Sequence, residues 1–209
     1  MKRTLLYTVL GIALFFSNRV TAQYLMSGTN DSTLPKIEFG LKLGANLQTI
    51  TGNVWDNSLK PAIAGGIYAG MHKNKIGVCI EVLAHTARYT SNGSAVIDSF
   101  GNKGDFRATY IDVPVLFEYN IFSLFWLQVG PQYSNLVSVK SLNNLQENGK
   151  VLFKSNEFSG VLGIEGRFPK NITGGLRAIF GLTDMNNQVV STDAWQNRTL
   201  QLYIAYRIK

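Results

Sequence analysis

Apolar and polar residues alternate along most of the chain after its first 35 residues. From Ile37 to Leu47, apolar side chains occupy every second position, and glycines or polar residues such as Glu38 and Lys42 lie between them. The same two-residue period appears in residues 76–86 and 110–119. Successive side chains of a β-strand point to opposite faces, so the period predicts three strands with one apolar and one polar face.

Five further segments show the same period with varying clarity. They are residues 62–71, which are rich in Gly and Ala, and residues 125–133, 158–168, 172–183 and 199–208. The total is eight predicted strands.

The connections between these strands alternate strictly in length. Short connections are expected at residues 72–75, 120–124 and 169–171, and long connections, rich in Asn, Ser, Gly and Asp, at 48–60, 89–108, 134–157 and 184–197. This pattern predicts an all-β fold, an eight-stranded antiparallel up-and-down transmembrane β-barrel with short periplasmic turns and long outer loops. Asn148-Gly149 is a strong hairpin signal, so the third long connection is expected to continue its two strands above the membrane.

The first 22 residues have the features of an export signal. Lys2 and Arg3 precede an apolar stretch of 12 residues, Leu5 to Phe16, and a small-residue cleavage site ends at Ala22. Twelve apolar residues are fewer than the roughly 20 that a spanning helix needs. The predicted organisation is a cleaved signal peptide (1–22), a periplasmic leader (23–36) and an outer-membrane barrel domain (37–209).

Composition narrows the classes of function. Removing Lys2, Arg3 and Arg19 with the signal lowers the formal charge from +7 to +4, and the remaining basic residues are scattered, which argues against a nucleic-acid partner. Charged residues make up 16% of the chain, below the roughly 25% usual in soluble domains, which suggests a surface that does not face water everywhere. The single cysteine excludes an internal disulfide.

A soluble eight-stranded barrel would also alternate, but it would turn its apolar face inward and its charges outward. The charges favour the membrane barrel, because five acids and four bases on the polar face, with one histidine, are nearly neutral, as an enclosed set must be. The predicted interior ion-pair network comprises Glu38, Lys42, Glu81, His85, Asp112, Glu118, Glu165, Arg167, Arg177 and Arg207.

Aromatic residues gather near the ends of the predicted strands, as in the girdles that line both membrane interfaces of such barrels. The predicted girdle comprises Tyr119, Phe122, Phe125, Trp126, Phe168, Trp195 and Tyr206. Polar-face glycines are expected to leave room for bulky neighbours inside a tightly curved barrel.

Four short motifs in order resemble a known family. Residues 40–46 (GLKLGAN), 110–116 (YIDVPVL), 129–133 (VGPQY) and 176–183 (LRAIFGLT) are similar to those of the PorT-like outer-membrane β-barrel proteins of Bacteroidetes. The resemblance implies an eight-stranded outer-membrane barrel, with one branch of the family tied to the type IX secretion system. It supplies no catalytic residues.

Candidate chemistry is sparse. His85 shares a polar strand face with Glu81, but four strand residues span about 13 Å, so the two cannot hydrogen-bond along that strand. Cys79 is expected to be a packed thiol, and the acids are too dispersed for a calcium loop. No enzyme activity, metal or cofactor is expected.

The expected function is therefore that of an integral outer-membrane barrel without enzyme activity. It would sit in outer-membrane lipid and present its long loops to an envelope or secretion-machinery protein or a surface ligand. Eight strands leave an interior that large side chains such as Arg167, Arg177, Tyr203 and Arg207 fill. A narrow solute channel and, less favoured, a small barrel enzyme acting on lipid remain as alternatives.

Overall fold

A computed structural model describes residues 34–93, 102–122, 124–143, 152–187 and 194–208. The predicted signal peptide and the Asn148-Gly149 turn lie outside the described residues, as does the predicted leader up to residue 33. No helix long and apolar enough to cross a membrane occurs in the described ranges.

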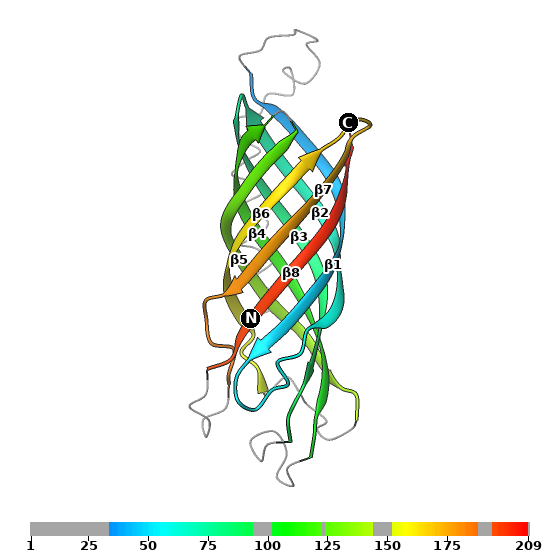
Figure 1. Cartoon of the computed structure of the whole chain (residues 1–209), viewed down its shortest axis with the longest axis vertical. Helices are drawn as coiled ribbons and strands as arrows, with labels where there is room; N and C mark the ends of the chain where they lie inside the picture. Colours follow the sequence, from blue (N-terminus) through cyan, green and yellow to red (C-terminus); the bar gives the residue numbers. More distant parts are fainter. Residues whose placement is uncertain (1–33, 94–101, 123, 144–151, 188–193, 209) are drawn as a thin grey trace, which may run out of the picture. The chain divides into compact units, whose positions relative to one another are not determined.

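Eight antiparallel strands form a closed barrel in which each strand pairs with its sequence neighbours and β1 closes against β8 (Figure 1). This confirms the predicted fold class. The strands are β1 (Lys36–Thr51), β2 (Lys60–Lys73), β3 (Ile76–Thr90), β4 (Asp105–Phe122), β5 (Phe125–Ser141), β6 (Asn156–Arg167), β7 (Ile172–Gly181) and β8 (Gln196–Ile208).

The apolar face of the barrel wall points outward and the polar face inward. Leu43, Ile63 and Leu202 are more than half exposed, whereas Glu81 and Arg177 are almost fully buried. A soluble barrel would show the reverse arrangement.

Most strands run further toward the long loops than the periodicity indicated. β4 and β5 reach 18 and 17 residues, well beyond the roughly 9–11 needed to cross a bilayer. The pairing of β4 with β5 continues to Phe106↔Ser141, whereas β5 and β6 pair only as far as Asn135↔Asn156. The sequence analysis expected the two strands on either side of the third long connection, β5 and β6, to continue together above the membrane. This expectation is wrong for their pairing, because the extension of β5 pairs with β4 and not with β6.

The short turns use residues that tolerate left-handed backbone angles. Asn74, in the β2–β3 turn, has a φ of 56°, and Lys170 and Asn171, between β6 and β7, have φ values of 63° and 64°. Asparagine adopts this region more readily than most residues, which suits these positions to tight hairpins.

The barrel interior contains two kinds of filling. Charged and polar side chains occupy its middle and its turn end, as predicted. At the loop end the filling is an apolar group that the sequence analysis did not identify, called here the aromatic plug: Ile50, Val54, Trp55, Ala87, Tyr89, Phe106, Ala108, Tyr110, Leu136, Leu152, Phe153, Met185 and Trp195.

Candidate functional site: the filled barrel interior and the loop surface

A buried carboxylate flanked by two cations lies at the centre of the interior. Glu81 on β3 accepts two hydrogen bonds from the Arg177 guanidinium on β7, with Nη1···Oε2 and Nη2···Oε1 distances of 2.8 and 2.7 Å. Lys42 on β1 reaches the same carboxylate with Nζ 2.5 Å from Oε1. A bidentate pair fixes the relative orientation of the two side chains and also neutralises their charges. It therefore forms a rigid link across the barrel between β3 and β7.

Tyr203 and Gln128 connect this centre to the next charged group. The Tyr203 hydroxyl donates to Oε2 of Glu165 at 2.8 Å, and its ring lies 4.0 Å from the Lys42 ammonium and 4.4 Å from the Arg177 guanidinium carbon. The Gln128 side chain accepts from Arg177 Nε and donates to Glu165, so amide and phenol extend the charge network without adding charge.

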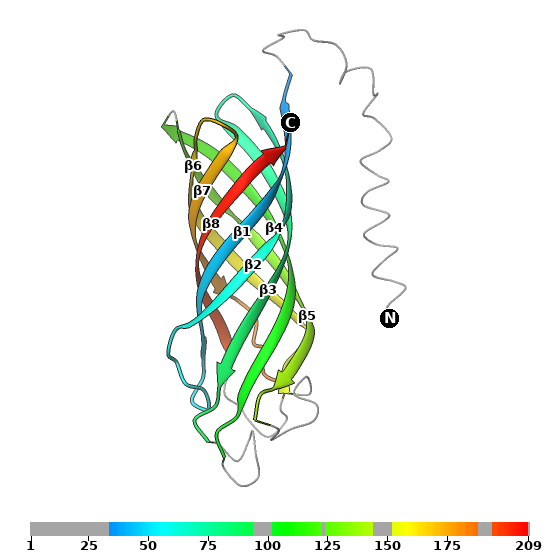
Figure 2. The ribbon, with the colours of Figure 1, turned by 90° about the vertical axis from the view of Figure 1, so that its right-hand side faces the viewer.

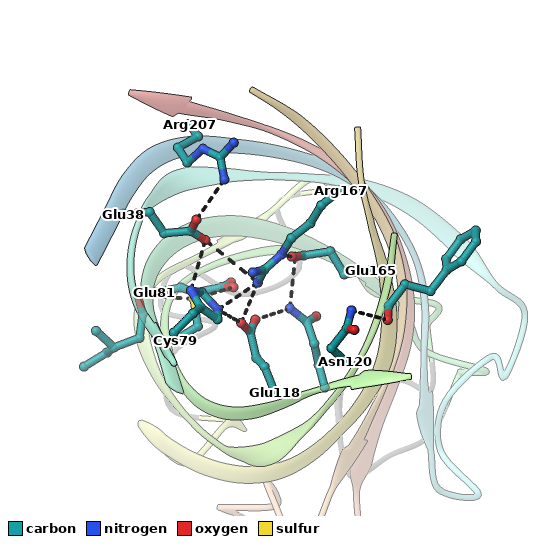
Figure 3. Close-up of polar contacts among 12 residues, drawn as sticks. Glu38, Cys79, Glu81, Glu118, Asn120, Glu165, Arg167 and Arg207 are labelled. Carbon is teal, nitrogen blue, oxygen red and sulfur yellow. Dashed lines mark hydrogen bonds and ion pairs between the residues drawn. The ribbon is translucent and has the colours of Figure 1, made fainter. Parts of the chain in front are cut away.

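Arg167 is the hub of the turn end of the network (Figure 3). Its Nε donates to Glu165 at 2.9 Å, and its Nη2 donates to Glu118 at 2.7 Å. Glu38 lies 3.8 Å from Arg167 and accepts from Arg207 Nη1 at 3.1 Å. These contacts close the ring of charge across β1, β4, β6 and β8.

A histidine–carboxylate pair lies on the loop side of the centre. His85 Nδ1 is 2.5 Å from Asp112 Oδ2, and the imidazole stacks on the Tyr110 ring at a centroid distance of 5.0 Å and an interplanar angle of 9°. The partner of His85 is therefore Asp112 on the next strand, and Glu81 pairs elsewhere. Glu157 on β6 is also buried, with Ser159 Oγ donating to it at 3.2 Å.

The aromatic plug closes the loop end above this pair. Trp55 from the β1–β2 loop contacts Trp195 edge-to-face at 5.1 Å and stacks on Phe153 at 5.4 Å. Trp195 and Phe153 come from loops before β8 and β6, so the plug joins three loops to the barrel wall. Aromatic pairs of this kind add stability beyond their buried area.

The loops are also tied to one another through backbone groups. Trp55 forms a β-bridge with Ser91, and Phe153 forms one with Asn186. Asn143 Nδ2 donates to the Lys103 carbonyl at 2.6 Å, which joins the segment after β5 to the segment before β4. The described parts of the four long loops thus form one connected surface.

Carboxylates organise two of these loops. Burial raises the pKa of Asp184, but the backbone N–H groups of Asn186 and Trp195, at 2.9 and 2.8 Å from Oδ1, outweigh it and leave the pKa below its ordinary value. In the first loop the Lys60 ammonium and the Ser58 side chain and N–H lower the pKa of Asp56. Both carboxylates hold their loops as anions.

Comparison with known proteins agrees with this architecture. A family model described as "Outer membrane protein beta-barrel domain" matches residues 21–187, which is more than half of the chain. The chain belongs to this outer-membrane β-barrel family. It is therefore located in the outer membrane.

A solved structure with a TM-score above 0.5 shares the fold at low sequence identity. The chain is similar to Neisserial surface protein A, with 11% identity and a TM-score of 0.53 over 81% of this chain and 97% of that one. The attachment invasion locus protein Ail of Yersinia pestis matches at 14% identity, a TM-score of 0.42 and coverages of 82% and 98%. OprG from Pseudomonas aeruginosa matches at 10% identity, a TM-score of 0.46 and coverages of 85% and 98%. No curated protein matches the sequence.

As in other outer-membrane β-barrels, aromatic residues face outward near the strand ends, but two of the seven predicted girdle residues do not. Tyr119, Phe122, Phe125, Phe168 and Tyr206 are all exposed on the outer face. The prediction of Trp126 as a girdle residue is wrong, because strand alternation turns its side chain inward. The Arg167 guanidinium carbon lies 4.1 Å from its ring. The prediction of Trp195 as a girdle residue is also wrong, because Trp195 precedes β8 and is fully buried in the aromatic plug.

All ten residues predicted for the ionic network have side chains in the interior of this outer-membrane barrel, and each has an ion-pair partner. His72 is a member of the network that the sequence analysis missed, and Glu157 is a buried interior acid that it also missed. The periodicity places His72 in a short connection and Glu157 in a long one, whereas in the structure both are strand residues and His72 pairs with Glu118. The signal was present in both cases, because each continues the inward register of the strand beside it: His72 follows outward Met71, and Glu157 precedes outward Phe158.

Cys79 lies in the interior as a free, buried thiol, with Sγ 3.8 Å from Glu81 Oε1. Within the described ranges, no cluster of three or more His, Cys, Asp or Glu side chains has the geometry to hold a metal ion.

Proposed function

We propose that this outer-membrane barrel is a non-conducting, non-enzymatic anchor that presents its connected loops to a protein partner in the cell envelope. The filled interior is the observation that carries the proposal. Arg177, Glu81 and Lys42 span the middle of the barrel, and Trp55, Phe153 and Trp195 cover the loop end. A solute would have to displace both fillings in turn.

The loops supply the interaction surface. Bridges and side-chain bonds connect the described parts of the loops, and Trp55 and Trp195 fix two of them to the plug, so these parts would need little ordering on binding. Surfaces that are preorganised in this way lose less conformational entropy when a partner docks. Exposed side chains such as Leu59, Leu142 and Asn143 are available for contact.

The resemblance of four motifs to the PorT-like proteins of Bacteroidetes supports an envelope partner, and the type IX secretion machinery is the candidate that it suggests. The lack of enzyme activity is supported by the surroundings of His85. Its ring is 6% exposed, paired with Asp112 and stacked on a residue of the aromatic plug. This position gives a substrate no direct approach.

Two measurements test the proposal. Purified protein in planar bilayers is expected to give no reproducible conductance, and regular single-channel steps would favour the narrow solute channel instead. Photo-crosslinking residues placed at the exposed loop positions Ser58 and Asn143 are expected to capture an envelope protein in intact cells. The same probe at the exposed turn positions Lys75 and Lys170 is the matched control, and crosslinks from these turns alone would overturn a loop-mediated role.

A further inference from the structure

The barrel wall opens between β2 and β3 near the loop end. Pairing of these strands stops at Ala64↔His85, although β1 and β2 remain paired to Gln48↔Lys60 and β3 and β4 to Thr90↔Asp105 (Figure 2). The two strands therefore separate over their last few residues while their other neighbours hold them in place.

A cleft of about 530 Å³ occupies this opening. Residues 61–63 of β2 and 86–88 of β3 form its two walls, and Ala45 and Arg107 contribute from β1 and β4. Ala62 and Ala87 contribute small side chains to the lining, and Ala87 belongs to the aromatic plug. The lining is thus mainly apolar and opens on the face that meets lipid.

A row of basic residues borders the cleft at the edge of the apolar belt. Arg88, Arg107 and Lys140 are direct neighbours on β3, β4 and β5, and all three are exposed on the outer face. Like charges placed directly opposite one another on adjacent strands destabilise a sheet. Such a row is explained most simply by a negatively charged group that neutralises it.

The residues that the structure describes neutralise only part of this charge. Arg88 forms an ion pair with Asp105, with Nε 3.1 Å from both carboxylate oxygens. Arg107 and Lys140 have no ion-pair partner among the residues that the structure describes. Two positive charges are therefore available beside an apolar cleft.

We propose that this cleft binds an acylated, phosphate-bearing lipid of the outer leaflet, namely the lipid A part of lipopolysaccharide. One acyl chain lies between β2 and β3, and a phosphate group meets Arg107 and Lys140. The loop side of an outer-membrane barrel faces the outer leaflet, which sets the source of the lipid. Clusters of Lys and Arg beside a membrane surface recognise anionic headgroups in this way. The proposal does not depend on a protein partner for the loops.

The test measures binding of diphosphorylated lipid A to the full mature protein in detergent by native mass spectrometry. Arg107→Gln is expected to weaken binding about fivefold, and Arg107→Gln with Lys140→Gln more strongly, because each basic residue near a charged surface adds a comparable factor. Arg198→Gln is the matched control, since Arg198 is exposed near the loop end of β8, outside the cleft, and its removal is expected to change binding little.

The acyl part of the site is tested separately. Thr86→Leu places a larger side chain in the cleft wall and is expected to weaken binding. Thr109→Leu is the control, because Thr109 is the direct partner of Thr86 on β4 but does not line the cleft. Gel migration without boiling verifies that each variant is folded. Lys140→Gln alone replaces an Arg107 variant that is not folded, and Ala45→Leu, which also enlarges a residue of the cleft lining, replaces Thr86→Leu.

Three results would overturn the proposal. Equal weakening of lipid A binding by Arg198→Gln and Arg107→Gln would show general attraction of the lipid to basic residues near the loop end of the barrel. Equal affinity for lipid A with and without phosphates would show that the basic row does not bind the phosphate groups. Unchanged binding by Thr86→Leu would show that no acyl chain occupies the cleft.

Discussion

Individual residues in the barrel interior are held by charge pairing among buried side chains. Arg177 is nearly fully buried and bonds both Glu81 and Gln128. Removing one partner of such a pair leaves a buried charge uncompensated, which costs more than the pair itself contributes.

Arg177→Leu is therefore expected to destabilise the folded barrel by roughly 3–5 kcal/mol. Denaturant titration in detergent micelles, followed by gel migration, measures the change. Arg198→Leu removes an exposed arginine and is expected to have little effect. Equal midpoints for Arg177→Leu and the unmodified protein would contradict the structural role of the network.

Glycine at one interior position makes room for the phenol that links this network. A Cβ at Gly175 would lie 2.3 Å from the Tyr203 ring, whereas a Cβ at the neighbouring Gly174 would meet nothing closer than 3.7 Å. The two positions alternate inward and outward on β7.

Gly175→Ala is expected to displace Tyr203 from Glu165 and to cost about 1–3 kcal/mol, in the range of overpacked cores. Gly174→Ala is the matched control and is expected to change stability by less. The same denaturant titration compares the two variants. A greater loss of stability for Gly174→Ala than for Gly175→Ala would show that the Tyr203 ring does not determine which residue fits at position 175.

At the level of elements, strands longer than the membrane requires carry the aromatic plug. The loop-side halves of β1, β3, β4 and β5 supply large side chains of the plug, namely Ile50, Tyr89, Phe106, Tyr110 and Leu136. The loops supply the others, namely Val54, Trp55, Leu152, Phe153, Met185 and Trp195. Asp184 positions one of them, because it accepts a hydrogen bond from the Trp195 N–H.

The docking of this loop against the plug is expected to weaken as the pH falls. Since the pKa of Asp184 is below its ordinary value of 3.8 in the folded protein, the carboxylate stabilises the docked loop above pH 3.8. The contribution is lost as pH falls through the lowered pKa. Tryptophan fluorescence of the unmodified protein is thus expected to change as the pH falls below about 4.

Asp184→Asn is the comparison for this titration. It keeps the shape of the side chain but removes the ionisable group, so its fluorescence is expected to be the less sensitive to acid. An identical acid transition in both proteins would assign the change to another group.

For the whole molecule, orientation in the membrane follows from which face is apolar. Leu202 lies well within the exposed apolar belt, and Leu182 lies at its loop edge, just beyond the end of β7. The cost of a charge on the lipid face depends on depth in the bilayer.

Leu202→Arg is expected to destabilise the barrel in lipid vesicles by roughly 2–4 kcal/mol and Leu182→Arg by about 1 kcal/mol or less. Unfolding in denaturant from phosphatidylcholine vesicles measures both. Similar small losses at the two positions would mean that the apolar face does not contact the acyl chains.

The sequence by itself determined the wall of this barrel. A two-residue period predicts eight strands and fixes which side chains share a face. The near-neutral set of charges on the polar face then indicated that this face, with Glu81 and Arg177, points inward and that the apolar belt points outward. The same period placed Trp126 inward, and the girdle assignment failed there because it weighed residue type above alternation.

Only the tertiary structure decided which interior groups meet and what closes the loop end. Pairs such as Arg177 with Glu81 join residues 96 positions apart, and their geometry depends on strand register and barrel closure, which local order does not encode. The aromatic plug takes Trp55, Phe153 and Trp195 from separate loops without periodicity. The cleft between β2 and β3 likewise arises where their pairing stops, and the alternation, which continues along both strands, does not show where that is.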